Sequence, residues 1–191
     1  MSNVIYSYMV SLDGFIETPE HSLDWGIIDE ELHRYINDQQ STIGAHLYGR
    51  RIYQLMAEFW PTADANPAHP DYIIEYARIW KQMPKIVFSK TLERVGPNTR
   101  LVRDDLAGEI ARLKAQPGKD LGLSGANLAA SFMRLGLIDE YQLFVQPVIL
   151  GSGTRMFPAL EKPTHLRLAE THTFSSGVVM LHYQRDASVG P

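Results

Sequence analysis

The chain has 191 residues, of which 45% are hydrophobic, and its formal net charge is −4. This length favours one domain with a well-buried core over residues 1–185, followed by a frayed tail at 186–191. Scattered basic residues argue against a nucleic-acid partner. The absence of cysteine excludes disulfides, thiolate catalysis and Cys-based zinc sites. The first residues do not resemble a secretory signal, and no apolar run approaches a membrane span, so we expect a cytoplasmic protein without membrane contact.

The first half of the chain alternates strands with helices. Residues 4–11 form a nearly continuous apolar run, typical of a strand buried on both faces, and the turn signal Asp13-Gly14 ends it. The patterns that follow predict a helix at 29–42, a strand at 43–48, and helices at 50–59 and 71–83. Two strands are then expected, at 85–89 and 99–102.

The second half continues this alternation and closes with a hairpin. Asp104 or Asp105 is expected to cap a helix that carries Leu106, Ile110 and Leu113. Patterns then predict a strand at 121–123, a helix at 127–135, a long strand at 140–150, and a hairpin of 166–173 with 178–184. The chain therefore predicts a three-layer α/β fold, with helices on both faces of a mixed, mostly parallel sheet of about eight strands.

Pro147 falls inside the strand predicted at 140–150. Proline cannot donate to a sheet ladder, so it indicates an edge or a bulge. Because Phe144, Val145, Val148 and Ile149 surround it, we interpret this strand as an apolar edge that a homodimer would cover.

The segment from Gly122 to Leu137 has the pattern of a phosphate-binding turn. A short strand leads into Ser124-Gly125, and a helix that carries Leu128 follows. Small residues let a ligand approach the backbone, and the first helical N–H groups have no partner within the helix. Together with the helix dipole they form an anion site. An ordinary tight turn with Ser124 as the helix cap explains the same pattern equally well, because the full GxGxxG is absent.

Two further strand ends carry groups that suit phosphates. Gly49-Arg50-Arg51 opens a helix, where cations oppose the helix dipole unless an anion is present. Ser89-Lys90-Thr91 offers hydroxyls and a charge at another strand end. Ligands of open α/β sheets gather at the carboxyl ends of strands, so three such ends favour a nucleotide site over a solvated surface.

Six segments in order resemble the dihydrofolate-reductase-like proteins related to the C-terminal reductase domain of the bifunctional riboflavin-biosynthesis deaminase–reductase. The resemblance covers nearly the whole chain, from Val4 to about Gln184. The segments are SLDGFI at 11–16, LYGRRIY at 47–53, PKIVFSKTL at 84–92, SGANL at 124–128, GLIDE at 136–140 and FVQPVILGSG at 144–153.

This resemblance implies a mixed eight-stranded sheet, an NADPH cofactor and a homodimer. It implies that Gly49, Arg50 and Arg51 contact the cofactor phosphates, and that Ser89 and Lys90, with Thr91 beside them, hold the adenosine ribose and its 2′-phosphate. By the same resemblance, the diphosphate would lie on Ser124, Gly125, Ala126, Asn127 and Leu128, and the nicotinamide on Met9, Val10 and Ile16.

The chain departs from the family in three places. Ile52 stands where the family usually has threonine, and Ser124-Gly125 stands where dihydrofolate reductases have paired glycines. The pterin-binding acid has no secure match, since Asp29, Glu30 and Glu31 are all near the right position. NADPH binding survives these departures, whereas folate specificity does not.

Asp13 is the candidate catalytic residue, because it lies at the end of a buried strand where it would orient substrate or relay a proton. A turn aspartate that bonds its own backbone is the alternative. Trp25 and Tyr53 are candidate substrate contacts, although both also suit the core, and Phe157 is similarly ambiguous. The histidines show no metal-ligand spacing, and no GxSxG motif is present, so neither a metal site nor a serine hydrolase is expected.

The leading interpretation is therefore an NADPH-dependent reductase of a small heterocyclic or related C=N or C=O compound. A dihydrofolate or pteridine reductase and a non-catalytic NADPH-binding module are the alternatives. Asp13 and Trp25 beside an open pocket would favour catalysis, whereas a pocket filled by side chains would favour binding alone.

Overall fold

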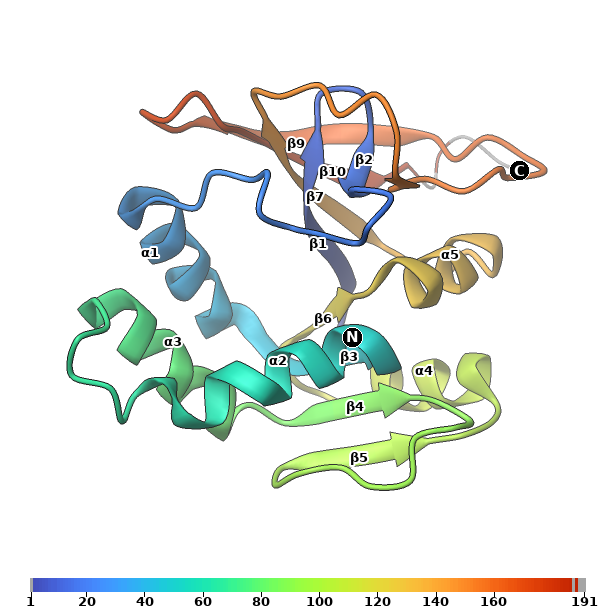
Figure 1. Ribbon diagram of the computed structural model, residues 1–191. Coiled ribbons are helices and arrows are strands. Elements are labelled where there is room, and N and C mark those ends of the chain that lie inside the picture. Colours follow the sequence, from blue (N-terminus) through green and yellow to red (C-terminus); the bar gives the residue numbers. More distant parts are fainter. Residues whose placement is uncertain (1, 187, 189–191) are drawn as a thin grey trace.

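The computed structural model describes residues 2–186 and residue 188. Its main sheet has eight strands in the order β5-β4-β3-β6-β1-β7-β10-β9 (Figure 1). The first six strands in this order, from β5 through β7, run parallel to one another. β10 is antiparallel to both β7 and β9. In that order the strands are Thr99–Val102, Lys85–Phe88, Ile43–Gly49, Asp120–Ser124, Val4–Ser11, Glu140–Gln146, Val179–Arg185 and Leu166–Thr173.

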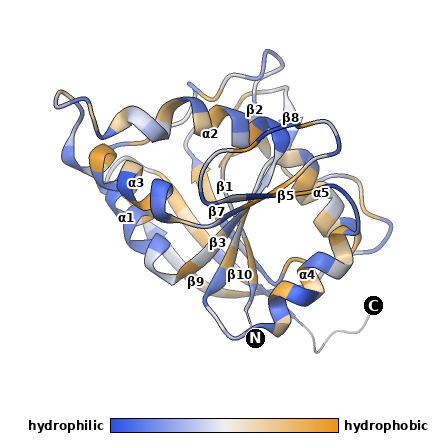
Figure 2. Cartoon of the chain, turned by 90° about the horizontal axis from the view of Figure 1, so that it is seen from below, coloured by the Kyte–Doolittle hydropathy of each residue, from blue (hydrophilic) through white to orange (hydrophobic). Residues whose placement is uncertain are grey.

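Helices cover both faces of this sheet, so the predicted three-layer α/β fold is confirmed. Figure 2 shows helices on either side of the sheet, and apolar residues of these helices pack in the core clusters against the strands. The helices on one side are α1 (Glu30–Gln39), α2 (Arg50–Ala63) and α3 (Asp71–Gln82), and those on the other are α4 (Leu106–Ala115) and α5 (Ala126–Arg134). A 3-10 turn, η1 (Gln40–Thr42), extends α1, so the helix predicted at 29–42 ends earlier than expected.

Apolar clusters lie on both faces of the main sheet. Val4 and Tyr6 are fully buried, and they pack with Phe132 and Met133 of α5 and with Ile110 of α4. A second apolar cluster lies between the sheet and α2 and α3, and it holds Tyr48 and Trp80. Continuous apolar strands need cover on both sides, and these two clusters provide it.

The strand predicted at 140–150 is shorter than expected and does not form an edge. β7 ends at Gln146, so Pro147 follows the strand, and β7 pairs with β1 on one side and β10 on the other. Phe144 is only 3% exposed, because its side chain packs against Leu32 and Phe174. The edges are β5 and β9. The reasoning that led from Pro147 to an apolar edge is therefore wrong, and the homodimer stays a prediction without that support.

A second, small sheet was not expected from the sequence. β2 (Phe15–Glu17) pairs antiparallel with β8 (Thr154–Arg155), with Glu17 opposite Thr154. Gly153 makes this approach possible, because a Cβ there would lie 2.0 Å from the Glu17 carbonyl oxygen. The segment Gly151–Gly153, which could be read as a phosphate turn, thus brings β8 against β2.

The tail predicted at 186–191 lies mostly outside the described residues. Within the described chain, Asp186 still donates its backbone N–H to His165. No helix of the described part has both the length and the apolar character that crossing a membrane requires.

Candidate nucleotide-binding site

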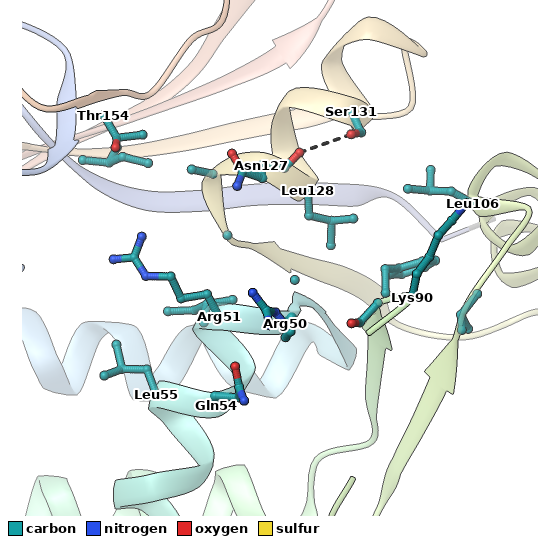
Figure 3. Close-up of a pocket in the computed structure, with 18 of the residues that line it drawn as sticks. Arg50, Arg51, Gln54, Leu55, Lys90, Leu106, Asn127, Leu128, Ser131 and Thr154 are labelled. Carbon is teal, nitrogen blue, oxygen red and sulfur yellow. Dashed lines mark hydrogen bonds between the residues drawn. The ribbon is translucent and has the colours of Figure 1, made fainter. Parts of the chain in front are cut away.

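A cavity of about 920 Å³ opens where β3, β4 and β6 end. These strands are parallel neighbours, so their carboxyl ends meet at one edge of the sheet. The cavity is lined by the start of α2, the end of β4 and the start of α5, and by residues of β1, β2 and β8 (Figure 3). The structure therefore brings together the three strand ends that the sequence singled out. Ten of the predicted site residues line the cavity: Ile16, Gly49, Arg50, Arg51, Ser89, Lys90, Gly125, Ala126, Asn127 and Leu128.

Two helix N-termini face each other in this cavity. α2 begins after Gly49 and α5 after Gly125, and neither N-terminus has a side-chain cap. Gly125 has a φ of +107°, and a Cβ there would lie 3.0 Å from Cγ2 of Ile52 and 3.5 Å from the Gly49 nitrogen. Only glycine permits this backbone and this close approach. Uncapped N–H groups from two helices make a strong anion site.

Arg50 and Arg51 have different surroundings. Arg50 lines the cavity and has no ion-pair partner among the residues that the structure describes. Arg51 donates from Nη2 to Oε2 of Glu17 at 2.6 Å and from Nη1 to Oε1 at 3.2 Å. Arg50 is thus available to an anionic ligand, whereas Arg51 already holds a carboxylate.

The end of β4 forms one end of the cavity. The Ser89 hydroxyl accepts hydrogen bonds from the backbone N–H groups of Thr91 and Leu92, so it caps a turn. Lys90 is 3.4 Å from Asp104, and both side chains are 80% exposed, so this pair holds Lys90 only weakly. Arg103, which the sequence did not single out, lines the cavity and donates to the carbonyl oxygens of Lys90 and Leu92. Thr91 is exposed and lies outside the cavity.

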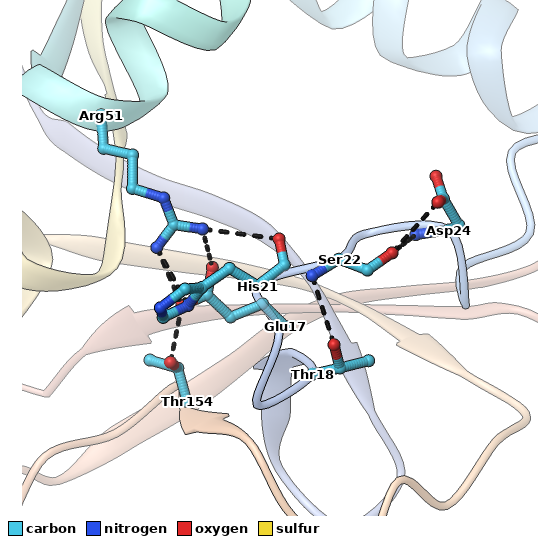
Figure 4. Close-up of polar contacts among 7 residues, drawn as sticks. All are labelled: Glu17, Thr18, His21, Ser22, Asp24, Arg51 and Thr154. Carbon is cyan, nitrogen blue, oxygen red and sulfur yellow. Dashed lines mark hydrogen bonds and ion pairs between the residues drawn. The ribbon is translucent and has the colours of Figure 1, made fainter.

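The opposite end of the cavity holds a buried carboxylate that the sequence did not reveal. Besides Arg51, Glu17 accepts a hydrogen bond from Thr154 Oγ1 at 2.6 Å, and its Oε1 is 2.8 Å from Nδ1 of His21 (Figure 4). Burial alone would raise the pKa of Glu17, but the hydrogen bonds from Arg51, Thr154 and His21 outweigh burial and lower it. Burial and then the Glu17 charge raise the pKa of neighbouring Tyr8 to about 12. This end therefore combines a fixed negative charge with a neutral phenol.

Asp13 lies outside the cavity. Its carboxylate accepts hydrogen bonds from Ser11 Oγ at 2.7 Å, from the Leu150 N–H at 3.1 Å and from the Gly151 N–H at 2.7 Å. These bonds, that from Ser11 first, lower the pKa of Asp13 to about 2. Both oxygens thus serve to join the turn after β1 to the loop after β7.

The two predicted substrate contacts also lie outside the cavity lining. Tyr53 is 5% exposed, packs in the cluster with Tyr48 and Trp80, and accepts a hydrogen bond from the Gly96 N–H. Tyr53 therefore belongs to the core and not to a substrate pocket, because its ring packs with residues of α3. Trp25 is partly buried and does not reach the cavity.

Three predicted cofactor contacts do not line the cavity. Val10 is 4% exposed and belongs to the main core. Met9 packs against the cluster of Leu32, Phe144 and Phe174 instead. Ser124 ends β6 directly before the cavity-lining Gly125, and it does not line the cavity itself. None of the three side chains is therefore placed to touch a ligand in this cavity.

The three acids near the pterin-binding position make structural contacts. Asp29 caps α1 by accepting from the Leu32 N–H at 2.9 Å, and Glu30 pairs with Arg34 at 2.9 Å. Glu31 accepts from the Ser175 N–H at 3.0 Å. None of the three lines the cavity. Residues 2–186 and 188 contain no group of three or more His, Cys, Asp or Glu arranged to hold a metal ion.

Comparison with known proteins agrees with this architecture. The RibD C-terminal domain family model matches residues 2–180. The uncharacterized protein YyaP of Bacillus subtilis (strain 168) is 35% identical over 181 residues, which are 94% of this chain and 93% of that protein.

Two solved structures share the fold. A putative riboflavin biosynthesis protein from Shewanella sp. PV-4 superposes with a TM-score of 0.76 at 21% identity, covering 97% of this chain and 99% of that chain. Dihydrofolate reductase from Enterococcus faecalis, complexed with NADP(H), gives a TM-score of 0.62 at 11% identity and covers 96% of each chain. The fold is thus dihydrofolate-reductase-like, and by its sequence the chain belongs to the RibD C-terminal domain family.

Proposed function

We propose that this protein is an NADPH-dependent reductase that acts on a small heterocyclic compound or a related C=N or C=O compound. The observation that carries the proposal is the meeting of two uncapped helix N-termini, α2 and α5, at the glycines Gly49 and Gly125. A dinucleotide diphosphate fits this arrangement, because it places negative charge against both sets of free N–H groups. Arg50, beside them, adds a charge-assisted contact.

The two ends of the cavity suit the two ends of NADPH. Lys90 and Arg103 at one end place positive charge where a 2′-phosphate would bind, with Leu106 and Leu128 as apolar walls for the adenine. Tyr8, Ile16 and Thr154 at the other end would surround the nicotinamide. When bound, the cofactor supplies the hydride, while the protein positions the reactants and excludes water.

A folate or pteridine reductase has less support, because Asp29, Glu30 and Glu31 are all engaged elsewhere. A non-catalytic NADPH-binding module is favoured by one observation, that neither Asp13 nor Trp25 lines the cavity. The cavity is nevertheless open, as catalysis requires. A screen of carbonyl and imine compounds for NADPH oxidation separates the two, since a binding module would oxidise NADPH with none of them.

Calorimetric titration with NADPH and NADH tests the proposal. We expect NADPH to bind more tightly than NADH, and Lys90→Ala to reduce that preference. Arg50→Ala should weaken both by about tenfold to a hundredfold, because a hydrogen bond to a charged group contributes about 1.5–3 kcal/mol. Lys162→Ala is the matched control, since Lys162 is exposed and outside the cavity. Failure of both nucleotides to bind the wild-type protein would refute the proposal.

A further inference from the structure

His21 and Glu17 form a histidine–carboxylate pair that lines the cavity at the end opposite Lys90. Nδ1 of His21 is 2.8 Å from the Glu17 carboxylate, so Glu17 fixes the orientation of the ring (Figure 4). The His21 side chain is 58% exposed, which leaves Nε2 accessible from the cavity and from solvent. Glu17 itself is 8% exposed and is held further by Thr154 and Arg51.

His21 has a backbone conformation that carries an energetic cost. His21 has a φ of +67°, in the left-handed region that non-glycine residues seldom adopt. Hydrogen bonds hold it there, from the His21 N–H to the Thr18 carbonyl at 2.9 Å and from the Ser22 N–H to Thr18 Oγ1 at 3.2 Å. Hydrogen bonds from Arg51 and Thr154 offset the burial of the Glu17 carboxylate, which is therefore held rigidly beside the ring. A residue in a sparsely populated backbone conformation beside a rigidly held carboxylate, at the wall of a cavity, indicates a functional role.

We propose that His21 is the proton donor of the reduction and that Glu17 is the positioning residue that holds its ring. This rests on the proposed function. The bound cofactor would supply a hydride to the substrate carbon, and His21 Nε2 would pass its proton to the substrate nitrogen or oxygen. The C=N or C=O bond would thereby gain one hydride, which carries both electrons, and one proton. The neutral ring keeps its Nδ1–H bond to Glu17 and regains a proton from solvent.

Charged groups of both signs surround His21. The charged groups that face it are Glu17 on β2, Glu20 in the same loop and Arg51 on α2. Tyr8 on β1 faces Glu17 and stays neutral. A bound diphosphate would add negative charge to this set, and added negative charge favours the imidazolium form. Binding of NADPH should therefore take up a proton at His21.

Calorimetric titration of NADPH in two buffers with different ionisation enthalpies measures this uptake. His21→Asn is the test variant, because asparagine tolerates positive φ and does not titrate; His21→Gly is a second variant that adopts this backbone freely. His165→Asn is the matched control, since His165 is exposed and outside the cavity. Because the 2′-phosphate of NADPH titrates as well, the informative quantity is the difference between wild type and variant.

We expect the wild-type protein and His165→Asn to take up more protons on binding than either His21 variant, by up to about one proton per NADPH. Glu17→Gln removes the charge that favours imidazolium. This variant should still bind NADPH, but its proton uptake should be close to that of the His21 variants. Equal proton uptake in wild type and both His21 variants would overturn the proposal and leave the reductase assignment intact. Absence of NADPH binding to the wild-type protein would overturn both.

Discussion

Arg50 and Arg51 are adjacent in the sequence but have different roles in the structure. Arg51 is bound to a glutamate that is 34 residues away along the chain, whereas Arg50 lines the cavity and is available to a ligand. The sequence cannot distinguish them, because the difference depends on Glu17. This residue lies in β2, a strand of only three residues that the sequence pattern does not predict. At the residue scale, an arginine is available to a ligand only where no carboxylate of the protein already pairs with it.

His46 on β3 illustrates a residue that burial keeps neutral. It is 6% exposed and stacks on Tyr48 with ring centroids 5.2 Å apart. Gly122 makes room for the ring, since a Cβ there would lie 3.1 Å from His46 Nδ1. Burial, and then the charge of Lys85, lower the pKa of His46 to about 4. The unfolded chain therefore takes up a proton at this residue at a higher pH than the folded one does.

This difference predicts a loss of stability in mild acid. The pKa of His46 is lower in the folded state than in the unfolded state. The contribution of neutral His46 to the free energy of unfolding is therefore complete above about pH 6.5 and is lost as the pH falls towards about 4. At about 1.4 kcal/mol per pH unit, the loss reaches roughly 3 kcal/mol at the lower limit. His46→Leu should flatten the urea-derived free energy of unfolding over this range. An unchanged slope in the variant would contradict the prediction.

At the scale of elements, periodicity predicted every helix and every strand of the main sheet, because long amphipathic or continuously apolar segments carry a strong signal. Boundaries such as that of β7 were less accurate, since Pro147 was assigned to the strand that it follows. The β2–β8 pair was missed because strands of three and two residues have no periodicity. Because of that omission, the sequence did not reveal that Glu17 and Thr154 line the cavity.

The meeting of α2 and α5 gives an element-scale prediction. Gly125→Ala should abolish NADPH binding, because the new Cβ would press on Ile52 and force the chain away from its φ of +107°. Both effects displace the N-terminus of α5, and the strained backbone should cost about 1 kcal/mol or more of stability. Binding is measured by calorimetry and stability by thermal unfolding.

Gly151→Ala is the matched control for this change. Gly151 also has positive φ, +76°, but a Cβ there would meet nothing within 4 Å. It should therefore lose a similar amount of stability and still bind NADPH. If Gly125→Ala binds NADPH as well as Gly151→Ala does, the α5 N-terminus takes no part in the site.

On the scale of the whole molecule, the strand order locates the cavity. The chain passes from β1 to β3, β4 and β5 in one direction, then returns to β6 and β7. α2 and α5 consequently lie on opposite faces of the sheet and begin side by side at its carboxyl edge (Figure 2). Such switch points are where open α/β sheets bind their ligands.

The homodimer stays a prediction at this scale. Leu12 is 66% and Ile149 is 70% exposed, and the Leu12 N–H donates to the carbonyl of Val148 beside Ile149, so these side chains form an exposed apolar surface. β9 adds an unpaired sheet edge. Sedimentation of the protein at micromolar concentration decides whether two copies associate.

Amide NMR mapping of NADPH binding tests the central claim most directly. We predict that the largest shift changes fall together on residues 49–51 and 125–128, at the two helix N-termini, and on residues 88–90 at the end of β4. Residues of β9, at the opposite edge of the sheet, should show no shift changes. Shift changes confined to one helix, or centred on α1 and α3, would contradict a dinucleotide site formed by α2 and α5.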